Sequence, residues 1–377
     1  MKMTILRLIA ALLALIFSHC LVHAQESRPL KILTFNAGGV PFVSPLSNRK
    51  KRFEDIARRL NKSDYDLVFL QEVWMKRDLK IFTEQSGYPY AAHVNSSMLF
   101  GNGLVVLSRF PVLETRVYTF TAAEPFHDFL DGDFWAAKGV LAARLDVGGR
   151  ALDVYNTHLV ANTSGREHIA LRHTQLYDLA GAVADFSKGR PFVLAGDFNF
   201  PPVYDGHKIL TRLLGAWDVC DGNGPGACSG TDVDGRLDYI FLSRHFAEEA
   251  ILAQDTDFRW ERSYPHFKYS DHQGFTATLN PSAINFGALP AAVDTDRRWA
   301  VAQVRNSILV HIRDIARRYH ERLWIPLYNF GYAIFMSARV VNFINLEREM
   351  SMVLQKKDLV YVPAYRMKGM RSRVLWR

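Results

Sequence analysis

Cysteine is scarce in this chain of 377 residues, which holds only three, Cys20, Cys220 and Cys228. The sequence has no HExxH motif and no cysteine pair with metal-ligand spacing, which argues against a zinc protease. It also has no internal repeat of fixed period, which argues against a repeat architecture. Hydrophobic residues make up 49% of the chain. This composition suits one large α/β domain, or one domain with an extension.

The first 24 residues predict a secretory signal peptide, because basic residues precede an apolar run that ends in a small-residue cleavage site at Ala24. A lipoprotein signal at Cys20 is the alternative, but the preceding His19 fits it poorly. Cys220 and Cys228 would remain after cleavage, and in an exported protein two such close cysteines predict a disulfide. Two free thiols are the other reading. We therefore expect a secreted or periplasmic protein, with membrane association as a further option.

Charge is unevenly spread along the chain. Residues 282–377 hold 16 Lys and Arg against 7 Asp and Glu, a balance of +9, whereas the whole chain carries +8. Residues 1–281 therefore sum to −1. A nucleic-acid-binding body needs a basic surface, so this distribution argues against nucleic acid as a partner.

Short apolar runs and amphipathic stretches together predict the fold class. Helices are expected at 49–62 and 166–186, where apolar residues recur at helical spacing, and the Gly148-Gly149 pair predicts a hairpin. Strands are expected at 30–37, 65–73, 101–112, 139–147, 150–159, 191–199, 236–243 and 274–280. Since strands dominate and many are joined by hairpins, we predict an α+β fold. It would be a four-layer sandwich of two packed mixed β-sheets flanked by helices.

A composition change at Pro281 divides the chain into a catalytic domain at 25–281 and a basic, mostly helical extension at 282–377. The extension begins with a predicted helix whose apolar stripe is Val301, Val304, Ile308, Leu309, Ile312 and Ile315. Such a stripe suits either contact with a membrane surface or packing on the domain. The next apolar run, 325–344, contains Pro326 and Arg339, so we expect an interfacial or core helix rather than a membrane span.

Polar residues end most of the predicted strands. They are Asn36, Glu72, Asn156, His158, Asp197, Asn199, Asp238, Asp271 and His272. Each alone reads as a turn cap, but a sheet gathers its strand ends at one edge. Carboxylate and carboxamide oxygens suit Mg²⁺, and histidines can move protons near neutral pH. The residues therefore predict a Mg²⁺-dependent phosphoester hydrolase.

The motifs TFNAGG, LQEVW, NTHL, GDFN and SDH resemble, in this order and spacing, the endonuclease/exonuclease/phosphatase superfamily over about residues 30–280. Within it, the stretches LKILTFNAGGVPF, GNGLVVLSRFPV and AAKGVLAARL are similar to the neutral sphingomyelinases. This resemblance implies a phosphodiesterase of phospholipase C type. It would cleave sphingomyelin, or a related choline phospholipid in a membrane, to ceramide and phosphocholine.

The resemblance also implies a metal set. Glu72 corresponds to the principal Mg²⁺ ligand, with Asn36 beside it and Asp271 completing the set; Mn²⁺ or Co²⁺ are alternative ions. Asp197 and Asn199 correspond to the pair that positions water and a phosphate oxygen.

The resemblance assigns the proton-moving residues as well. His272 corresponds to the general base, oriented by Asp271, and His158 to a second histidine on the leaving-group side. Asp238 supports the site. Asp133 and Lys138, in DFWAAKG, correspond to a switch at the mouth of the site; a surface ion pair is the plainer reading.

Two other functions stay open on the sequence alone. One is a secreted nuclease related to DNases, for which the basic extension would have to supply the track for the phosphate backbone. The other is a membrane-binding protein whose catalytic body is vestigial.

Overall fold

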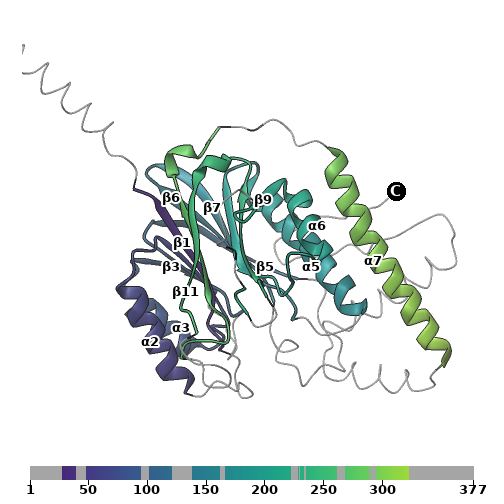
Figure 1. Ribbon diagram of the computed structural model, residues 1–377, viewed down its shortest axis with the longest axis horizontal. Helices are drawn as coiled ribbons and strands as arrows, with labels where there is room; N and C mark the ends of the chain where they lie inside the picture. Colours follow the sequence, from purple (N-terminus) through teal and green to yellow (C-terminus); the bar gives the residue numbers. More distant parts are fainter. Residues whose placement is uncertain are drawn as a thin grey trace, which may run out of the picture.

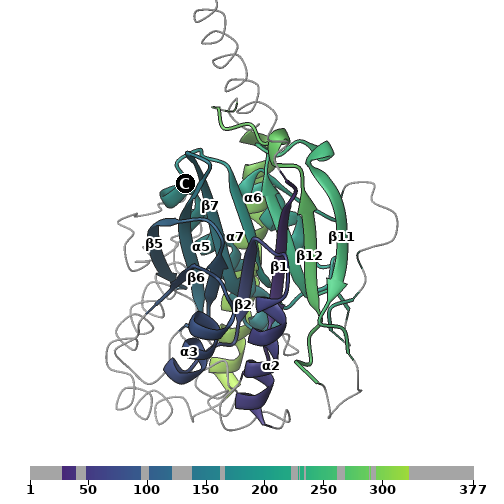
Figure 2. The ribbon, with the colours of Figure 1, turned by 90° about the vertical axis from the view of Figure 1, so that its left-hand side faces the viewer.

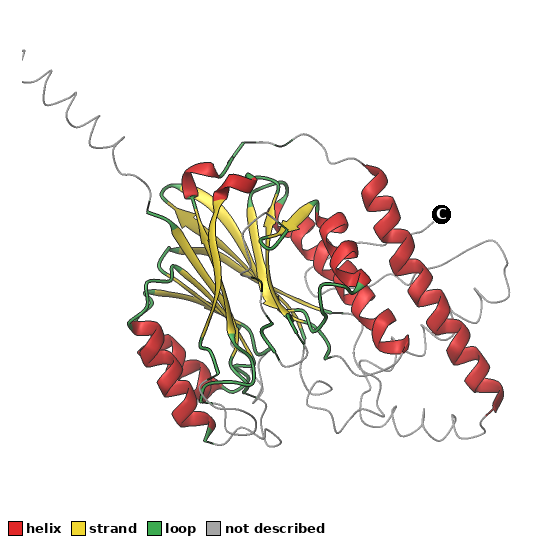
Figure 3. Cartoon of the chain, viewed as in Figure 1, coloured by secondary structure: helices red, strands yellow, loops and turns green. Residues whose placement is uncertain are grey.

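The computed structural model describes residues 28–39, 48–94, 102–120, 138–161, 166–221, 228, 230–232, 235–260, 268–287, 289 and 294–321. Twelve strands form two six-stranded sheets, and helices cover the outer face of each sheet (Figures 1 and 3). The predicted α+β sandwich of two mixed sheets is confirmed.

The first sheet has the order β11-β12-β1-β2-β4-β3, and Figure 2 shows β11, β12, β1 and β2 side by side. The strands are β1 (Leu30–Asn36), β2 (Leu67–Gln71), β3 (Tyr90–His93), β4 (Val105–Ser108), β11 (Ile251–Asp257) and β12 (Gly274–Leu279). The second sheet has the order β5-β6-β7-β8-β10-β9. Its strands are β5 (Val112–Thr119), β6 (Gly139–Val147), β7 (Arg150–His158), β8 (Phe192–Asp197), β9 (Ala216–Asp218) and β10 (Asp238–Ser243).

Three apolar clusters hold the layers together. Between the sheets, alternate residues of the facing strands, such as Ile32, Phe69 and Val193, are fully buried. On the outer face of the first sheet, Phe35 and its neighbours pack against α2 (Arg49–Asn61) and α3 (Lys76–Gln85). On the outer face of the second, Tyr155 and its neighbours pack against α5 (Arg166–Ser187) and α6 (Asp205–Leu214). Each large side chain buried in this way contributes roughly 1.5–3 kcal/mol.

Helix α7 (Asp294–Glu321) packs on α5 and α6. Its Ala300 and Val304 are buried in the same cluster as the second sheet, and Trp299, Val301 and Ile308 pack at the edge of that cluster. Val301, Val304 and Ile308 of the predicted stripe therefore face the domain, and membrane contact through this face is not supported. The division at 281/282 stays a prediction, and the apolar run 325–344 lies outside the described residues. Within the part of the chain that the structure describes, no helix is long and apolar enough to cross a membrane.

The disulfide predicted from the sequence is present, between Cys220 and Cys228. It closes the segment that joins β9 to β10, on the way to Asp238.

Candidate active site

Strand register brings the predicted polar residues to one edge of the sandwich. In the second sheet β7 runs parallel to β8 and pairs His158 with Asp197, while β10 runs antiparallel to β8 and pairs Asp238 with Asp197. In the first sheet β1 runs parallel to β2 and pairs Asn36 with Gln71, the residue before Glu72. Because parallel strands end at the same edge, and β10 begins where β8 ends, these side chains are neighbours although they are far apart in the chain.

Asn36 links the two sheets at this edge. Its Nδ2 donates to Asp197 Oδ2 at 2.9 Å and to Glu72 Oε1 at 3.2 Å, and its Oδ1 accepts from Gly38 N at 3.0 Å. Glu72 adopts a left-handed backbone with φ of 61°, which is uncommon outside glycine. A Cβ on Gly39 would come within 2.0 Å of the backbone oxygen of Glu72, so only glycine lets the loop after β1 approach the main chain of Glu72 so closely.

His272 and Asp238 form a buried hydrogen-bonded pair. His272 Nδ1 lies 2.9 Å from Asp238 Oδ2, and His272 Nε2 lies 3.7 Å from Asp197 Oδ2. Asp238 is fully buried, and its Oδ1 has no hydrogen-bond partner among the described residues. The resemblance predicted that Asp271 orients His272. In the structure the hydrogen-bond partner of His272 Nδ1 is Asp238 instead. The Asp271 carboxylate accepts from Ser270 Oγ at 3.0 Å.

The second histidine lies on the other side of Asp197. His158 Nε2 is 3.5 Å from Asp197 Oδ2, and the whole side chain is only 4% exposed. Burial, together with the charges of Lys138 and His272, lowers the pKa of His158 well below its usual value. His158 is therefore neutral at pH 7.

The electrostatics of Asp197 and His272 are linked. Burial raises the pKa of Asp197 to about 7, although the charge on His272 acts in the opposite direction. Burial alone would lower the pKa of His272, but the carboxylates of Asp238 and Asp197 outweigh it and raise this pKa well above its usual value. Without further positive charge at the site, His272 holds its proton.

Lys138 and Asn199 meet at one carbonyl. Lys138 Nζ donates to Leu159 O at 2.6 Å, and Asn199 Nδ2 donates to the same oxygen at 3.0 Å. Asn199 is left-handed, with φ of 52°, and its N–H donates to Asp197 Oδ1 at 2.9 Å. Lys138 is thus buried beside Asn199. Asp133, its predicted partner, lies outside the described residues.

Arg52 is a site neighbour that the sequence did not reveal. Its guanidinium is buried and donates to the carbonyl oxygens of Ala37, Gly38 and Tyr269. Burial lowers the pKa of Arg52 to about 10, while the nearby carboxylates of Asp271 and Glu72 favour its charge. The only signal in the sequence is a charged residue on the apolar face of the helix at 49–62.

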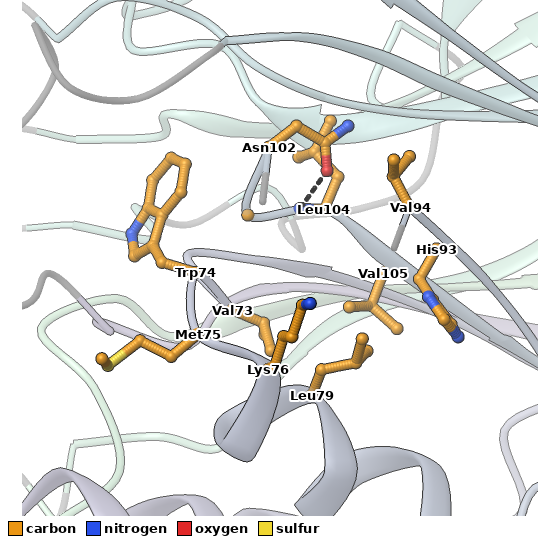
Figure 4. Close-up of a pocket in the computed structure, with 11 residues that line it drawn as sticks. Val73, Trp74, Met75, Lys76, Leu79, His93, Val94, Asn102, Leu104 and Val105 are labelled. Atoms are coloured by element: carbon orange, nitrogen blue, oxygen red, sulfur yellow. Dashed lines mark hydrogen bonds between the residues drawn. The ribbon is translucent and has the colours of Figure 1, made fainter. Parts of the chain in front are cut away.

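A pocket adjoins the site at the start of α3 (Figure 4). Trp74 forms one wall, and its ring centroid is 6.3 Å from that of His158. The same ring packs directly over Gly103, where a Cβ would come within 2.6 Å of it. The rest of the lining is mostly apolar, with Lys76, His93 and Asn102 as polar members. Trp74 therefore separates this apolar pocket from the histidine.

The donor set fits a divalent cation. Asp197, Asp238 and His272 offer ligand atoms within 4.8 Å of one another. The carboxylate of Glu72 is joined to this group through Asn36. Burial of Asp197 disfavours its charged form, and Asp238 Oδ1 is unpartnered; a cation would supply the missing positive charge. A second cluster consists of His207, Asp218 and Asp221. Here the positive charge is already present, because Arg236 donates to both carboxylate oxygens of Asp218.

Two mixed sheets carry a buried cluster of carboxylates, histidines and amides at their shared edge, and three members of this cluster form a candidate metal site. The chain belongs to the Endonuclease/Exonuclease/phosphatase family, whose model matches residues 33–272.

Relatives within this family include sphingolipid enzymes. The chain is 29% identical over 275 residues to a putative neutral sphingomyelinase of Drosophila melanogaster, which covers 66% of this chain and 60% of that protein. It is 31% identical over 198 residues to human sphingomyelin phosphodiesterase 2, over 51% of this chain and 46% of that protein. The chain thus spans between 46% and 60% of the length of these relatives.

Among solved structures, a variant of beta toxin from Staphylococcus aureus with bound magnesium ions is similar, with a TM-score of 0.53 and 19% identity. The match covers 66% of this chain and 99% of that one. At this identity the likeness concerns the fold.

Proposed function

We propose that this protein is a Mg²⁺-dependent phosphodiesterase of phospholipase C type. Its substrate would be sphingomyelin or a related choline phospholipid, and its products ceramide and phosphocholine. The observation that carries the proposal is the buried row of His158, Asp197, Asp238 and His272. The lipid substrate is inferred from the similarity to the fly and human sphingomyelinases.

His272 is the proton acceptor in this proposal. Asp238 binds Nδ1, so Nε2 is the ring nitrogen directed towards Asp197 and the site. A water held at Asp197 and Asn199 would attack phosphorus and pass its proton to His272 Nε2. The bond between phosphorus and the ceramide oxygen would break with its electron pair staying on that oxygen, which would take a proton from solvent water as it leaves.

His158 and Lys138 would hold the phosphate during this reaction. A neutral His158 can donate a hydrogen bond to an oxygen, and buried Lys138 adds positive charge beside Asp197. Both act where negative charge develops, and a buried setting strengthens such interactions.

The resemblance assigns Mg²⁺ to Glu72, Asn36 and Asp271. Asn36 is hydrogen-bonded to both Glu72 and Asp197, so a cation held by this set would neutralise the charge of the phosphate oxygens. Added positive charge here also lowers the pKa of His272, because it opposes the carboxylates that raise it. The neutral His272 that proton acceptance requires is therefore coupled to a filled metal site.

We also propose that the protein is secreted or periplasmic. The signal peptide predicted over the first 24 residues motivates this localisation. The disulfide between Cys220 and Cys228 supports it, because disulfides persist in oxidising compartments.

One experiment tests the proposed function. The purified protein is given labelled sphingomyelin in mixed micelles or plasmid DNA, each with Mg²⁺ and with a chelator. We expect release of phosphocholine with Mg²⁺, none with chelator, and intact DNA. Cleavage of DNA alone would indicate a nuclease, and no hydrolysis of either substrate would refute the enzymatic proposal.

A further inference from the structure

Thr231 occupies a buried position between the disulfide and β10. It is 0% exposed. Its Oγ1 accepts hydrogen bonds from Leu237 N at 3.0 Å and from Asp238 N at 3.1 Å. One hydroxyl oxygen therefore accepts from the backbone N–H groups of both Leu237 and Asp238. Asp238 is the residue whose carboxylate contacts His272.

The backbone of Thr231 contacts the other half of the same pair. Its carbonyl oxygen accepts from Gln273 N at 2.7 Å, directly after His272. Gln273 Nε2 donates to Gly230 O at 3.2 Å, one residue before Thr231. Asp238 begins β10 of the second sheet, whereas His272 lies just before β12 of the first. This short segment contacts the main chain at Asp238 and directly after His272.

Thr231 is also held firmly itself. Its N–H donates to Gly235 O at 3.0 Å, and the backbones of Asp232 and Gly235 are hydrogen-bonded to each other in both directions. Leu237 O accepts from Phe198 N at 2.9 Å, so the same backbone continues to the loop that carries Asp197 and Asn199. A displacement at Thr231 would reach Asp238, His272 and Asp197 together.

We propose that Thr231 is a positioning residue that sets the relative placement of Asp238 and His272. The inference rests on the proposed function for its effect on catalysis, but its structural part does not need a substrate. Without the hydroxyl, two buried N–H groups lose their acceptor, and the start of β10 must shift or admit water. Small displacements of catalytic groups reduce turnover strongly.

The test compares Thr231→Val, which keeps the shape and removes the oxygen, with Thr231→Ser, which keeps the oxygen. Hydrolysis is measured with bis(p-nitrophenyl) phosphate as well as sphingomyelin, so that the result does not depend on the lipid. We expect Thr231→Val to lower kcat by about 10- to 100-fold with KM changed less than about threefold. Thr231→Ser should stay within about threefold of the unmodified protein.

Amide hydrogen exchange gives a second readout that needs no activity. Exchange at Leu237 and Asp238 should quicken about tenfold or more in Thr231→Val but not in Thr231→Ser, because local opening becomes easier. If Thr231→Val does not fold, Thr231→Ala removes the same oxygen and takes its place.

Thr174→Val is the matched control. Thr174 is also buried, but its hydroxyl donates to Ala170 O within α5 and does not contact Asp238 or His272. We expect it to melt at a lower temperature with kcat unchanged. Unchanged exchange and kcat in Thr231→Val, an equal kcat loss in Thr174→Val, or failure of Thr231→Ser to restore kcat would each overturn the proposal. If amide exchange quickens in Thr231→Val but the unmodified protein hydrolyses neither substrate, the structural role of Thr231 stands and the proposed phosphodiesterase function is rejected.

Discussion

Asp238→Asn probes the pair on which the proposed mechanism depends. The carboxylate of Asp238 is fully buried and lies 2.9 Å from His272 Nδ1. A hydrogen bond to a charged group contributes about 1.5–3 kcal/mol, and about 1.4 kcal/mol corresponds to a tenfold change in rate. Loss of the charge alone should therefore lower kcat about 10- to 100-fold.

The asparagine can reduce the rate further by changing the tautomer of His272. A carboxamide that turns its NH₂ towards Nδ1 favours the tautomer with the proton on Nε2, which then cannot accept one. We expect a total loss of kcat of about 10²- to 10⁴-fold, the scale of a lost general base. Because Asn keeps the shape of Asp, the melting temperature should change by only a few degrees, on the order of ~1 kcal/mol.

Asp218→Asn is the control, because Asp218 is also a buried aspartate that contacts a histidine. Asp218 Oδ2 lies 3.0 Å from His207 Nε2, and Arg236 donates to both carboxylate oxygens. Removing the charge leaves Arg236 buried without its counterion, which costs about 3–5 kcal/mol of stability. This variant should melt at a much lower temperature but keep its kcat where it is folded.

The pH dependence of the control follows from the pKa of Asp218. Burial raises this pKa, but hydrogen bonds from His207 and Arg236 outweigh burial and bring it below its usual value. The carboxylate therefore stabilises the fold above its unfolded pKa of about 3.9, and this contribution is lost as the pH falls through the lower, folded pKa. The stability difference between the unmodified protein and Asp218→Asn should shrink below about pH 4.

The measurements are kcat with the soluble diester and with sphingomyelin micelles, and thermal melting by circular dichroism. If Asp238→Asn turns over within about threefold of the unmodified protein while folded, far short of the loss of a general base, the Asp238–His272 pair does not carry the proton transfer. A loss of kcat in Asp218→Asn equal to that in Asp238→Asn would show that stability, not the pair, controls the rate.

Three further variants test other parts of the structure. Glu72→Gln keeps the shape and removes a charge, so activity should need far more Mg²⁺; an unchanged Mg²⁺ titration curve would exclude Glu72 as a ligand. Lys138→Met removes the buried charge beside Asp197 and should cut kcat by about 10²-fold, whereas unaltered kinetics would leave Lys138 with a structural role only. Val304→Asp buries a charge between α7 and the sandwich and should lower stability by several kcal/mol. Normal melting of Val304→Asp would show that α7 is not part of the core.

The sequence by itself determined eight of the twelve strands that the structure describes and most of the polar residues at their ends, whereas β3, β5, β9 and β11 were not predicted. Strand patterns and motif chemistry are local, so the strands that end in Asn36, His158 and Asp197 could be placed before their neighbours were known. The meeting of these ends at one edge also followed, because parallel strands end together.

Only the tertiary structure decided which groups meet across that edge. Asp238, rather than Asp271, contacts His272 because antiparallel pairing of β10 with β8 sets Asp238 beside Asp197, and loop packing then brings His272 onto it. Thr231 and Arg52 act through backbone groups that any residue possesses, so no motif marks their targets. The apolar stripe of α7 suited a bilayer and a protein surface equally, because the hydrophobic effect depends on the apolar area removed from water and not on what covers it. In the structure Val304 packs on the faces of α5 and α6 that point away from the second sheet.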